Sequence, residues 1–209
     1  MSERIERSAA DVGNLYPWFT ASLIPRAIAW VSTISAEGVA NLAPDSFTTV
    51  AGVDPPTLCF VSVGAKDTLA NVRATGEFVL QIGSWSQLAQ MNDSATPLPI
   101  DEDEFALAQI ATAPSSAVRP PRVADAPVAF ECRASGEHVI GDCVMVFGEV
   151  VHLSVDAAVA ADDGLPDART LDPLARLGRS EWGRLGEVLA LDRITWRRWQ
   201  EGERSARTD

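Results

Sequence analysis

Short runs of β-branched and aromatic residues follow one another along this chain, and glycine, proline or acidic residues separate each run from the next. Such runs are typical of strands bounded by turns. Their spacing predicts strands at 27–35, from 39 onward, and at 46–53, 57–63, 77–82, 128–134 and 143–155. Only short helices fit between them, so a doubly wound sheet of alternating strands and full-length helices is disfavoured. The sequence therefore predicts a mainly β fold, an antiparallel barrel.

Two short helices are predicted beside the strands. Asp67 or Thr68 is expected to cap the first, which should end at Gly76, because glycine adopts the left-handed conformation that often closes a helix. The second is expected from Ser84 to Asn92, where large apolar residues recur every third position. Neither is long enough to form a separate helical layer.

The two long strands near the middle of the chain differ in pattern. In the strand at 128–134 alternate residues should face opposite sides, with Val128, Phe130, Cys132 and Ala134 in and Ala129, Glu131 and Arg133 out. The strand at 143–155 is apolar on both faces over 144–147. A strand buried on both sides indicates a closed barrel with a helix or another subunit packed outside it.

A long segment at 94–125 is rich in proline and contains the acidic run 101–104. We predict a surface excursion there, since loops of this length in a compact domain are usually functional or disordered. The acidic run is interpreted as a solvated face, because a cation site needs carboxylates arranged around a turn. No metal site is predicted.

Composition narrows the class of protein. The 209 residues, 46% of them apolar, suffice for one domain over 1–209 with a sizeable core. The net charge of -12 argues against a nucleic-acid partner, because such binding draws most of its affinity from lysines and arginines that neutralise phosphates. No apolar run approaches the roughly 18 residues of a membrane span, and residues 1–20 lack the pattern of a secretory signal. We therefore expect a soluble, cytoplasmic protein without a membrane partner.

The common catalytic motifs are missing from the sequence. It has no G-x-G-x-x-G, Walker or G-x-S-x-G motif, and its two histidines, His138 and His152, form no close pair with a cysteine. The three cysteines, Cys59, Cys132 and Cys143, lie in apolar runs, so we interpret them as reduced core residues. The basic and aromatic patch at 196–199 is interpreted as a packing or subunit contact.

The stretches 41–47 and 66–71 are the best candidates for a binding site. They combine small residues, hydroxyls and Lys66, which stands just before a predicted helix start. A lysine and the free N–H groups of a helix N-terminus together favour an anion, so the pair suits a flat cofactor bearing a phosphate. The alternative is an ordinary hairpin, with Asp67 as a helix cap and Lys66 as a surface charge.

Taken together, these stretches resemble the flavin reductase-like family of FMN-binding split barrels, of the flavoredoxin type. The resemblance covers about residues 15–180 and leaves 181–209 as a C-terminal extension. The matching pieces occur in the family's order, at 25–33, 41–47, 54–56, 66–71, Phe105, 127–132, 148–151 and 174–178.

The resemblance implies a homodimeric, antiparallel split β-barrel with short helices that binds FMN noncovalently near the subunit interface. Beside the flavin it places Arg26, Ser32 and Thr33, and along the ring edge Asn41, Leu42, Ala43, Pro44, Asp45 and Ser46. Around the phosphate it places Thr48, Ser62, Lys66 and Thr68, with Asp67 in the same loop and Asn71 supporting it. Arg26 and Arg176 are the candidate cations for the reduced ring.

The function implied is an FMN-dependent oxidoreductase of flavin-reductase type. It would take hydride from NAD(P)H and pass electrons to free flavin, a partner oxygenase or a small acceptor. Because flavin accepts hydride directly, no catalytic side-chain triad is required. Two alternatives stay open, a flavin-binding electron carrier without pyridine-nucleotide activity and a barrel for another small ligand.

Overall fold

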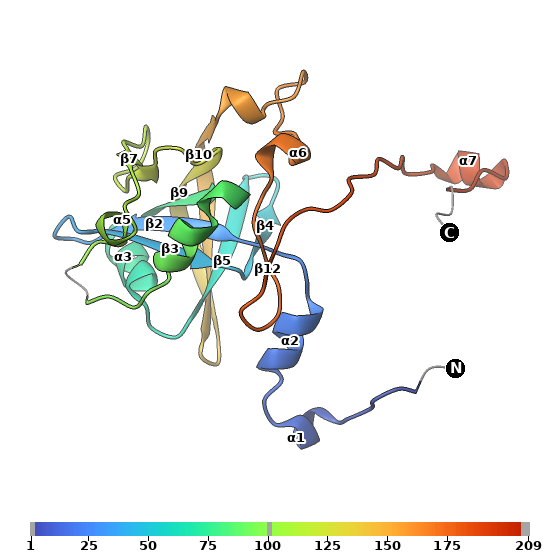
Figure 1. Ribbon diagram of the computed structural model, residues 1–209, viewed down its shortest axis with the longest axis horizontal. Helices are drawn as coiled ribbons and strands as arrows, with labels where there is room; N and C mark the ends of the chain where they lie inside the picture. The colour runs from blue at the N-terminus through green and yellow to red at the C-terminus, as the bar shows by residue number, and fades with distance from the viewer. Residues whose placement is uncertain (1–2, 100–101, 206–209) are drawn as a thin grey trace.

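The protein folds around one antiparallel sheet that curls into a barrel. The computed structural model describes residues 3–99 and 102–205 (Figure 1). The sheet has the order β3-β2-β6-β9-β10-β5-β4. The strands are β2 (Ala29–Ile34), β3 (Ala40–Asp45), β4 (Thr48–Gly52), β5 (Thr57–Val63), β6 (Glu77–Ile82), β9 (Val128–Ile140) and β10 (Cys143–Val155). The mainly β, antiparallel architecture predicted from the sequence is confirmed.

The barrel closes without a hydrogen-bonded ladder between its two edge strands. Ser46 and Phe47 join β3 directly to β4, and β3 also contacts β5 across the barrel. The free edge of β3 therefore keeps backbone groups that no neighbouring strand pairs, which makes it available to side chains and ligands. This edge organises the candidate site.

Aromatic side chains fill the interior of the barrel. The Phe60 and Phe78 rings meet edge to face with centroids 5.3 Å apart, and both are buried. Helix α3 (Asp67–Thr75) contributes Leu69 and Val72 to the same core and covers β2, β3 and β6 at one end. Burial of one such side chain stabilises the fold by about 1.5–3 kcal/mol, so α3 is held to the barrel by its apolar face.

The 94–125 excursion forms a second layer outside β2 and β3. It follows η1 (Trp85–Gln87) and α4 (Leu88–Asp93), and it contains α5 (Glu104–Leu107), β7 (Thr112–Ala113) and β8 (Arg122–Val123). A second core cluster lies under this layer and includes Trp30, Leu42, Met91 and Phe105. The segment is thus an excursion, as predicted, but it buries apolar residues of its own.

Buried polar side chains of the sheet fasten this layer. Ser32 donates to the Pro121 carbonyl oxygen, and the Glu131 carboxylate accepts from the backbone N–H groups of Ser116 and Ala117. Gln81 donates to the Trp30 carbonyl oxygen and accepts from the Val123 N–H. Each pairing satisfies a loop backbone group that burial would otherwise leave without a partner.

Three details of the sequence prediction are corrected here. Ala134 is exposed, because at this point β9 has run past the start of β6. Glu104 is buried, so the acidic run is not a uniformly solvated face; Asp101 lies outside the described residues. Cys59 and Cys132 are buried thiols, but Cys143 is only partly buried.

A small second sheet ties the end of the barrel domain to its beginning. It has the order β1-β11-β12, from β1 (Arg26–Ala27), β11 (Ala175–Arg176) and β12 (Trp182–Gly183). The stretch at 174–178, one of the pieces that carry the family resemblance, supplies β11. In β1 and β11, Arg26 lies opposite Arg176. This pairing brings the two predicted flavin-side arginines together although 150 positions separate them.

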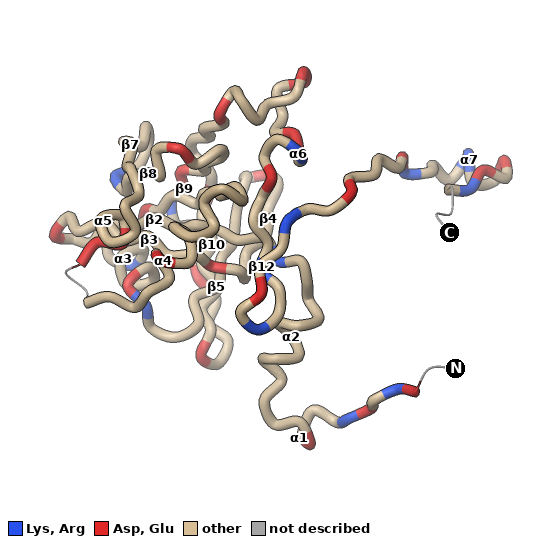
Figure 2. The backbone as a smooth tube through the Cα atoms, viewed as in Figure 1, with Lys and Arg blue, Asp and Glu red and all other residues tan. Residues whose placement is uncertain are grey.

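Both chain ends extend from the barrel as arms (Figure 1). The first carries α1 (Ala9–Val12) and α2 (Tyr16–Ser22), and the second carries α7 (Trp196–Gln200). Between β10 and β11 lie η2 (Ala157–Val159) and α6 (Ala168–Leu171). Figure 2 shows acidic residues on several sides of the barrel and both charge signs in the two arms.

Two further properties concern only the residues that the structure describes. No helix within 3–99 or 102–205 is long and apolar enough to cross a bilayer. Within the same ranges, no group of histidine, cysteine and acidic side chains is arranged to hold a metal ion.

Candidate functional site

Two neighbouring cavities follow the free edge of β3. The first, the Lys66 cavity, has a volume of about 310 Å³ and lies between β3, the start of α3, residues 94–98 and Glu104. The second, the Arg176 cavity, has about 190 Å³ and is lined by Ile28, Pro44, Ser46, Asn92, Ala95, Arg176 and Trp182. Pro44 and Ala95 border both. An elongated ligand can therefore run from Lys66 to Arg176 along β3.

The residues of β3 explain why this edge is open. Ala43 has a small side chain, and Pro44 carries no N–H group, so neither closes the space beside the strand. The Leu42 N–H does point to the edge, where the buried Glu104 carboxylate accepts it at 3.0 Å. Burial raises the pKa of Glu104 and the Leu42 hydrogen bond opposes that rise. Glu104 thus forms one wall of the Lys66 cavity.

The start of α3 offers donors to an anion. Lys66 is the N-cap residue, and within the described chain no side chain caps the first turn. The expected cap by Asp67 or Thr68 is wrong, because both residues lie inside the helix. Its first backbone N–H groups therefore have no intrahelical partner, and Lys66 lines the same cavity. A phosphate fits this arrangement.

A buried network holds this corner together. The Asn41 side chain donates to the hydroxyls of Thr33 and Thr68, at 3.2 and 3.1 Å. Asn71 donates to the same Thr33 hydroxyl at 3.1 Å. The network binds β2, β3 and α3 to one another, so the Lys66 corner is rigid before any ligand arrives. Thr33 itself is fully buried beneath it.

Arg26 holds three chain segments instead of presenting a free cation. Its guanidinium donates to the Leu177 carbonyl oxygen at 2.8 Å, to the carbonyls of Thr20 and Leu23, and to Ser46 Oγ at 3.4 Å. Desolvation lowers its pKa; Tyr16 raises it and Arg176 lowers it further. The arginine therefore fixes the turn between β3 and β4 against α2 and the chain after β11.

Arg176 keeps its cation at the mouth of the second cavity. The guanidinium lies over the Trp182 ring, 4.6 Å from its centroid. It also donates to the carbonyls of Ser180 and Arg179, at 3.4 and 3.2 Å. These contacts orient the side chain where it lines the Arg176 cavity beside Ser46.

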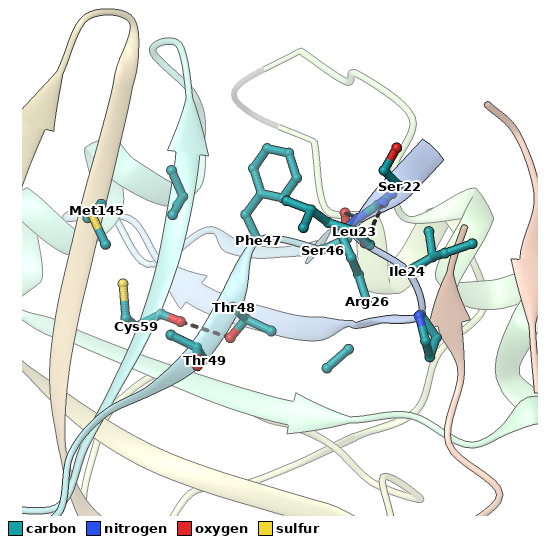
Figure 3. Close-up of a pocket in the computed structure, with 13 residues that line it drawn as sticks. Ser22, Leu23, Ile24, Arg26, Ser46, Phe47, Thr48, Thr49, Cys59 and Met145 are labelled. Atoms are coloured by element: carbon teal, nitrogen blue, oxygen red, sulfur yellow. Dashed lines mark hydrogen bonds between the residues drawn. The ribbon is translucent and has the colours of Figure 1, made fainter. Parts of the chain in front are cut away.

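A third and larger cavity lies on the other side of the β3–β4 turn. It has about 550 Å³ and is formed by residues 22–27, 46–49 and three side chains of β5 and β10. Figure 3 shows Phe47, Leu23 and Ile24 on one side and Cys59 and Met145 on the other. Thr48 lines this cavity and donates to the Cys59 carbonyl oxygen at 2.8 Å.

The predicted residues therefore separate into groups. The structure brings together Lys66, Asp67, Thr68 and Asn41 in the Lys66 cavity, and Asp45 and Ser62 in a space of about 20 Å³ that adjoins it at Ala43 and Pro44. Thr48 and Arg26 line the 550 Å³ cavity. Three predicted residues are buried and line none of these cavities: Ser32, Thr33 and Leu42. Asn71 stands behind Thr33 as a support.

Comparison with known proteins identifies the family. Residues 21–174 match the flavin reductase like domain. The chain belongs to this family. An uncharacterized protein of Halalkalibacterium halodurans is 35% identical over 192 residues, which are 86% of this chain and 91% of that protein.

Several solved structures share the fold. Nitrilotriacetate monooxygenase component B from Bacillus cereus is 31% identical with a TM-score of 0.80, covering 91% of this chain and 98% of its own. The 2-nitrobenzoate 2-nitroreductase from Pseudomonas fluorescens is 26% identical with a TM-score of 0.83, and the match covers 92% of this chain and 98% of that protein's chain. A Shewanella frigidimarina protein with a split barrel domain, 18% identical, superposes with a TM-score of 0.83 over 91% and 100% of the two chains. The predicted split barrel is confirmed.

The sequence reasoning missed one wall of this flavin reductase-like site. Glu104, Asn92 and residues 94–98 line the cavities, yet nothing near them in sequence marks a binding role. The one available signal was the apolar turn at Phe105, which packs into the second core beside Leu42. Burial of Phe105 draws Glu104 toward the edge of β3, a consequence that only the folded chain reveals.

Proposed function

We propose that this protein is an FMN-dependent oxidoreductase of flavin-reductase type, which takes hydride from NAD(P)H and passes electrons to an acceptor. One observation carries the proposal: two neighbouring cavities along β3 share Pro44 and Ala95, and an uncapped helix start with Lys66 lines one of them while Arg176 lines the other. The family membership of residues 21–174 supports it.

The residues present fit FMN. Lys66, the first N–H groups of α3 and the Thr68 hydroxyl would hold the phosphate, since charge-assisted hydrogen bonds and the helix dipole act together there. Ala43 and Pro44 leave room for the ribityl chain, and the ring would lie along Pro44–Ser46 toward the Arg176 cavity. When bound, FMN supplies the hydride acceptor of the reaction.

The side chains of the protein would hold and orient the flavin and neutralise the charge of its reduced ring. Arg176, oriented by Trp182, would offset the negative charge of a reduced ring. Arg26 keeps Ser46 in place but has its guanidinium engaged by backbone carbonyls. Arg176 also donates to two carbonyls, but it lines the cavity beside Pro44 and Ser46, whereas Arg26 lines the 550 Å³ cavity. On that ground we assign charge stabilisation to Arg176 and a positioning role to Arg26.

Assembly and partners belong to the same proposal. Leu23 and Ile24 are exposed and line the 550 Å³ cavity, and the aromatic residues Tyr16, Trp18 and Phe19 of the preceding helix α2 are exposed as well. Exposed apolar clusters of this kind mark interfaces, which supports a homodimer of the single 1–209 domain. Similarity to a monooxygenase component B supports a partner oxygenase as the electron acceptor.

A visible spectrum followed by anaerobic reduction tests the proposal. The purified protein, reconstituted with FMN and freed of excess, should show bound flavin absorption. A protein that stays colourless would refute every flavin-based function and favour a barrel for another ligand. Anaerobic NADH or NADPH should then bleach the bound flavin. Retained colour would refute the reductase and favour an electron carrier.

A further inference from the structure

A carboxylate lies within the proposed cofactor path. Asp45 ends β3 between Pro44 and Ser46, and its Oδ1 accepts a hydrogen bond from the Phe47 N–H at 2.7 Å. The side chain lines the roughly 20 Å³ space beside Lys66. Asp45 therefore stands between the proposed ring edge and the proposed phosphate position.

Lys66 is the cation that lines the same small space as this carboxylate. Asp45 and Lys66 are the charged residues among those lining the small space; the others are Val31, Ala43, Pro44, Phe60, Ser62 and Thr68. Two thiols also interact with the Asp45 charge, those of Cys59 on β5 and Cys143 on β10. Burial is the largest cause that raises the pKa of each thiol, and the negative charge of Asp45 raises it further. Both thiols are therefore neutral near pH 7.

The surroundings make the charge of Asp45 variable near neutral pH. Burial raises the pKa of Asp45 to about 6, while the Phe47 N–H and Lys66 act in the opposite direction. Below this pH the side chain is a neutral acid. Above it, a carboxylate shares Lys66 with whatever anion occupies the site.

We propose that the ionisation of Asp45 sets the preference of the site between phosphorylated and unphosphorylated flavin. The inference rests on the proposed FMN site. A neutral Asp45 leaves Lys66 free to pair with the phosphate. An ionised Asp45 competes for Lys66 and repels the phosphate, whereas riboflavin has no phosphate to be repelled.

Replacement of Asp45 by asparagine isolates this charge. Asparagine keeps a side-chain oxygen for the Phe47 N–H, so the turn is preserved. Dissociation constants of FMN and riboflavin are measured by fluorescence at pH 5, 6.5 and 8 for wild type and Asp45→Asn. The second ionisation of the phosphate, near pH 6, occurs with both proteins, so the pH profile of Asp45→Asn is the reference for the wild-type profile.

We expect the preference of wild type for FMN over riboflavin to fall by about three- to tenfold, relative to Asp45→Asn, between pH 5 and 8. The matched control is Asp163→Asn. Asp163 is exposed, and its side chain accepts a hydrogen bond from the Leu165 N–H, two residues further on, at 3.0 Å. The substitution therefore removes the same charge and leaves the same kind of turn as Asp45→Asn. This variant should behave as wild type.

Two outcomes would count against the inference, and they differ. Parallel pH profiles for wild type and Asp45→Asn, with both proteins binding FMN, would overturn the role of Asp45 and leave the proposed function standing. If neither flavin binds at any pH, the proposed function fails and the inference falls with it.

Discussion

The Arg26 guanidinium donates to the Leu177 carbonyl oxygen at 2.8 Å, and this bond joins the first strand of the small sheet to the chain that follows β11. The same side chain reaches Ser46. One arginine thus links the entry of the domain, its late segment and the turn next to the proposed ring site.

Arg26→Ala should destabilise the protein by about 1–3 kcal/mol, because several backbone carbonyls lose a charged donor. Urea unfolding of the flavin-free protein measures the change. Arg197→Ala is the control; its ion pair with Glu201 is exposed, and surface substitutions of this kind change stability by about 0.5 kcal/mol or less. Equal effects of the two variants would contradict the assigned role of Arg26.

Lys66→Ala should weaken FMN binding by about tenfold or more and leave riboflavin binding nearly unchanged, since the lost contact is a charge-assisted one to phosphate. Equilibrium titration with both flavins measures this. Arg73→Ala removes a cation from the last turn of the same helix, where Arg73 pairs with the exposed Glu137, and should affect neither ligand. Equal losses of FMN and riboflavin on Lys66→Ala would argue against a phosphate contact.

Glu131→Gln should loosen the 94–125 layer. The fully buried carboxylate accepts hydrogen bonds from two backbone N–H groups, those of Ser116 and Ala117. In glutamine an NH₂ group replaces one of the two oxygens, so one backbone N–H would face a donor instead of an acceptor. We expect a loss of about 1–3 kcal/mol and faster proteolysis within the layer. Glu137→Gln, at an exposed ion pair, serves as control. Unchanged proteolysis in Glu131→Gln would show that this carboxylate does not hold the layer.

Gly148→Ala should destabilise the barrel, because a Cβ atom there would overlap Phe78 Cζ inside the packed core. Overpacking of this kind costs about 1–3 kcal/mol. Thermal unfolding compares it with Gly136→Ala on β9, where a Cβ atom meets no described atom within 4 Å. A Gly148→Ala protein as stable as the Gly136→Ala protein would mean that Phe78 can move aside.

The stability of the flavin-free protein should depend on Asp45. Its pKa is raised in the folded state, from 3.8 to about 6, so folding binds a proton in this window and stability falls as pH rises through it. Asp45→Asn should therefore be about 1–2 kcal/mol more stable than wild type at pH 7.5 and no different at pH 3.5. Melting curves of both proteins at the two pH values measure this. A stability difference between Asp45→Asn and wild type that persists at pH 3.5 would point to another cause.

Local patterns in the sequence were enough to predict most of the barrel. Gly76 ends α3 in the left-handed conformation, and the second short helix begins next to Ser84, as the sequence indicated; the structure adds a capping box between Ser84 and Gln87. These features depend on residues a few positions apart. The helix cap at Lys66 was missed because which residue becomes the cap depends on how the preceding loop leaves β5.

Long-range contacts account for the parts of the site that could not be predicted. Thr33 carries the same hydroxyl as Thr68, yet it is buried beneath Asn41 and Asn71 and lines neither cavity. Arg26 has the charge expected of a flavin neighbour, yet carbonyls of distant segments engage it. The residue type shows which partners a side chain can bind, and only the folded structure shows which of them are close enough.

The strands along the chain, the short helices and the family could all be predicted from the amino-acid sequence, because each follows from local periodicity, turn residues or a series of motifs. The ligand edge at 41–46 is a prediction from the same motifs. The folded chain was needed to show that Glu104 lines the Lys66 cavity, that Arg26 pairs with Arg176 across β1 and β11, and that Asp45 and Lys66 line one space. These relationships join residues far apart in the chain, and their distances are set by how the barrel closes and how its second layer packs.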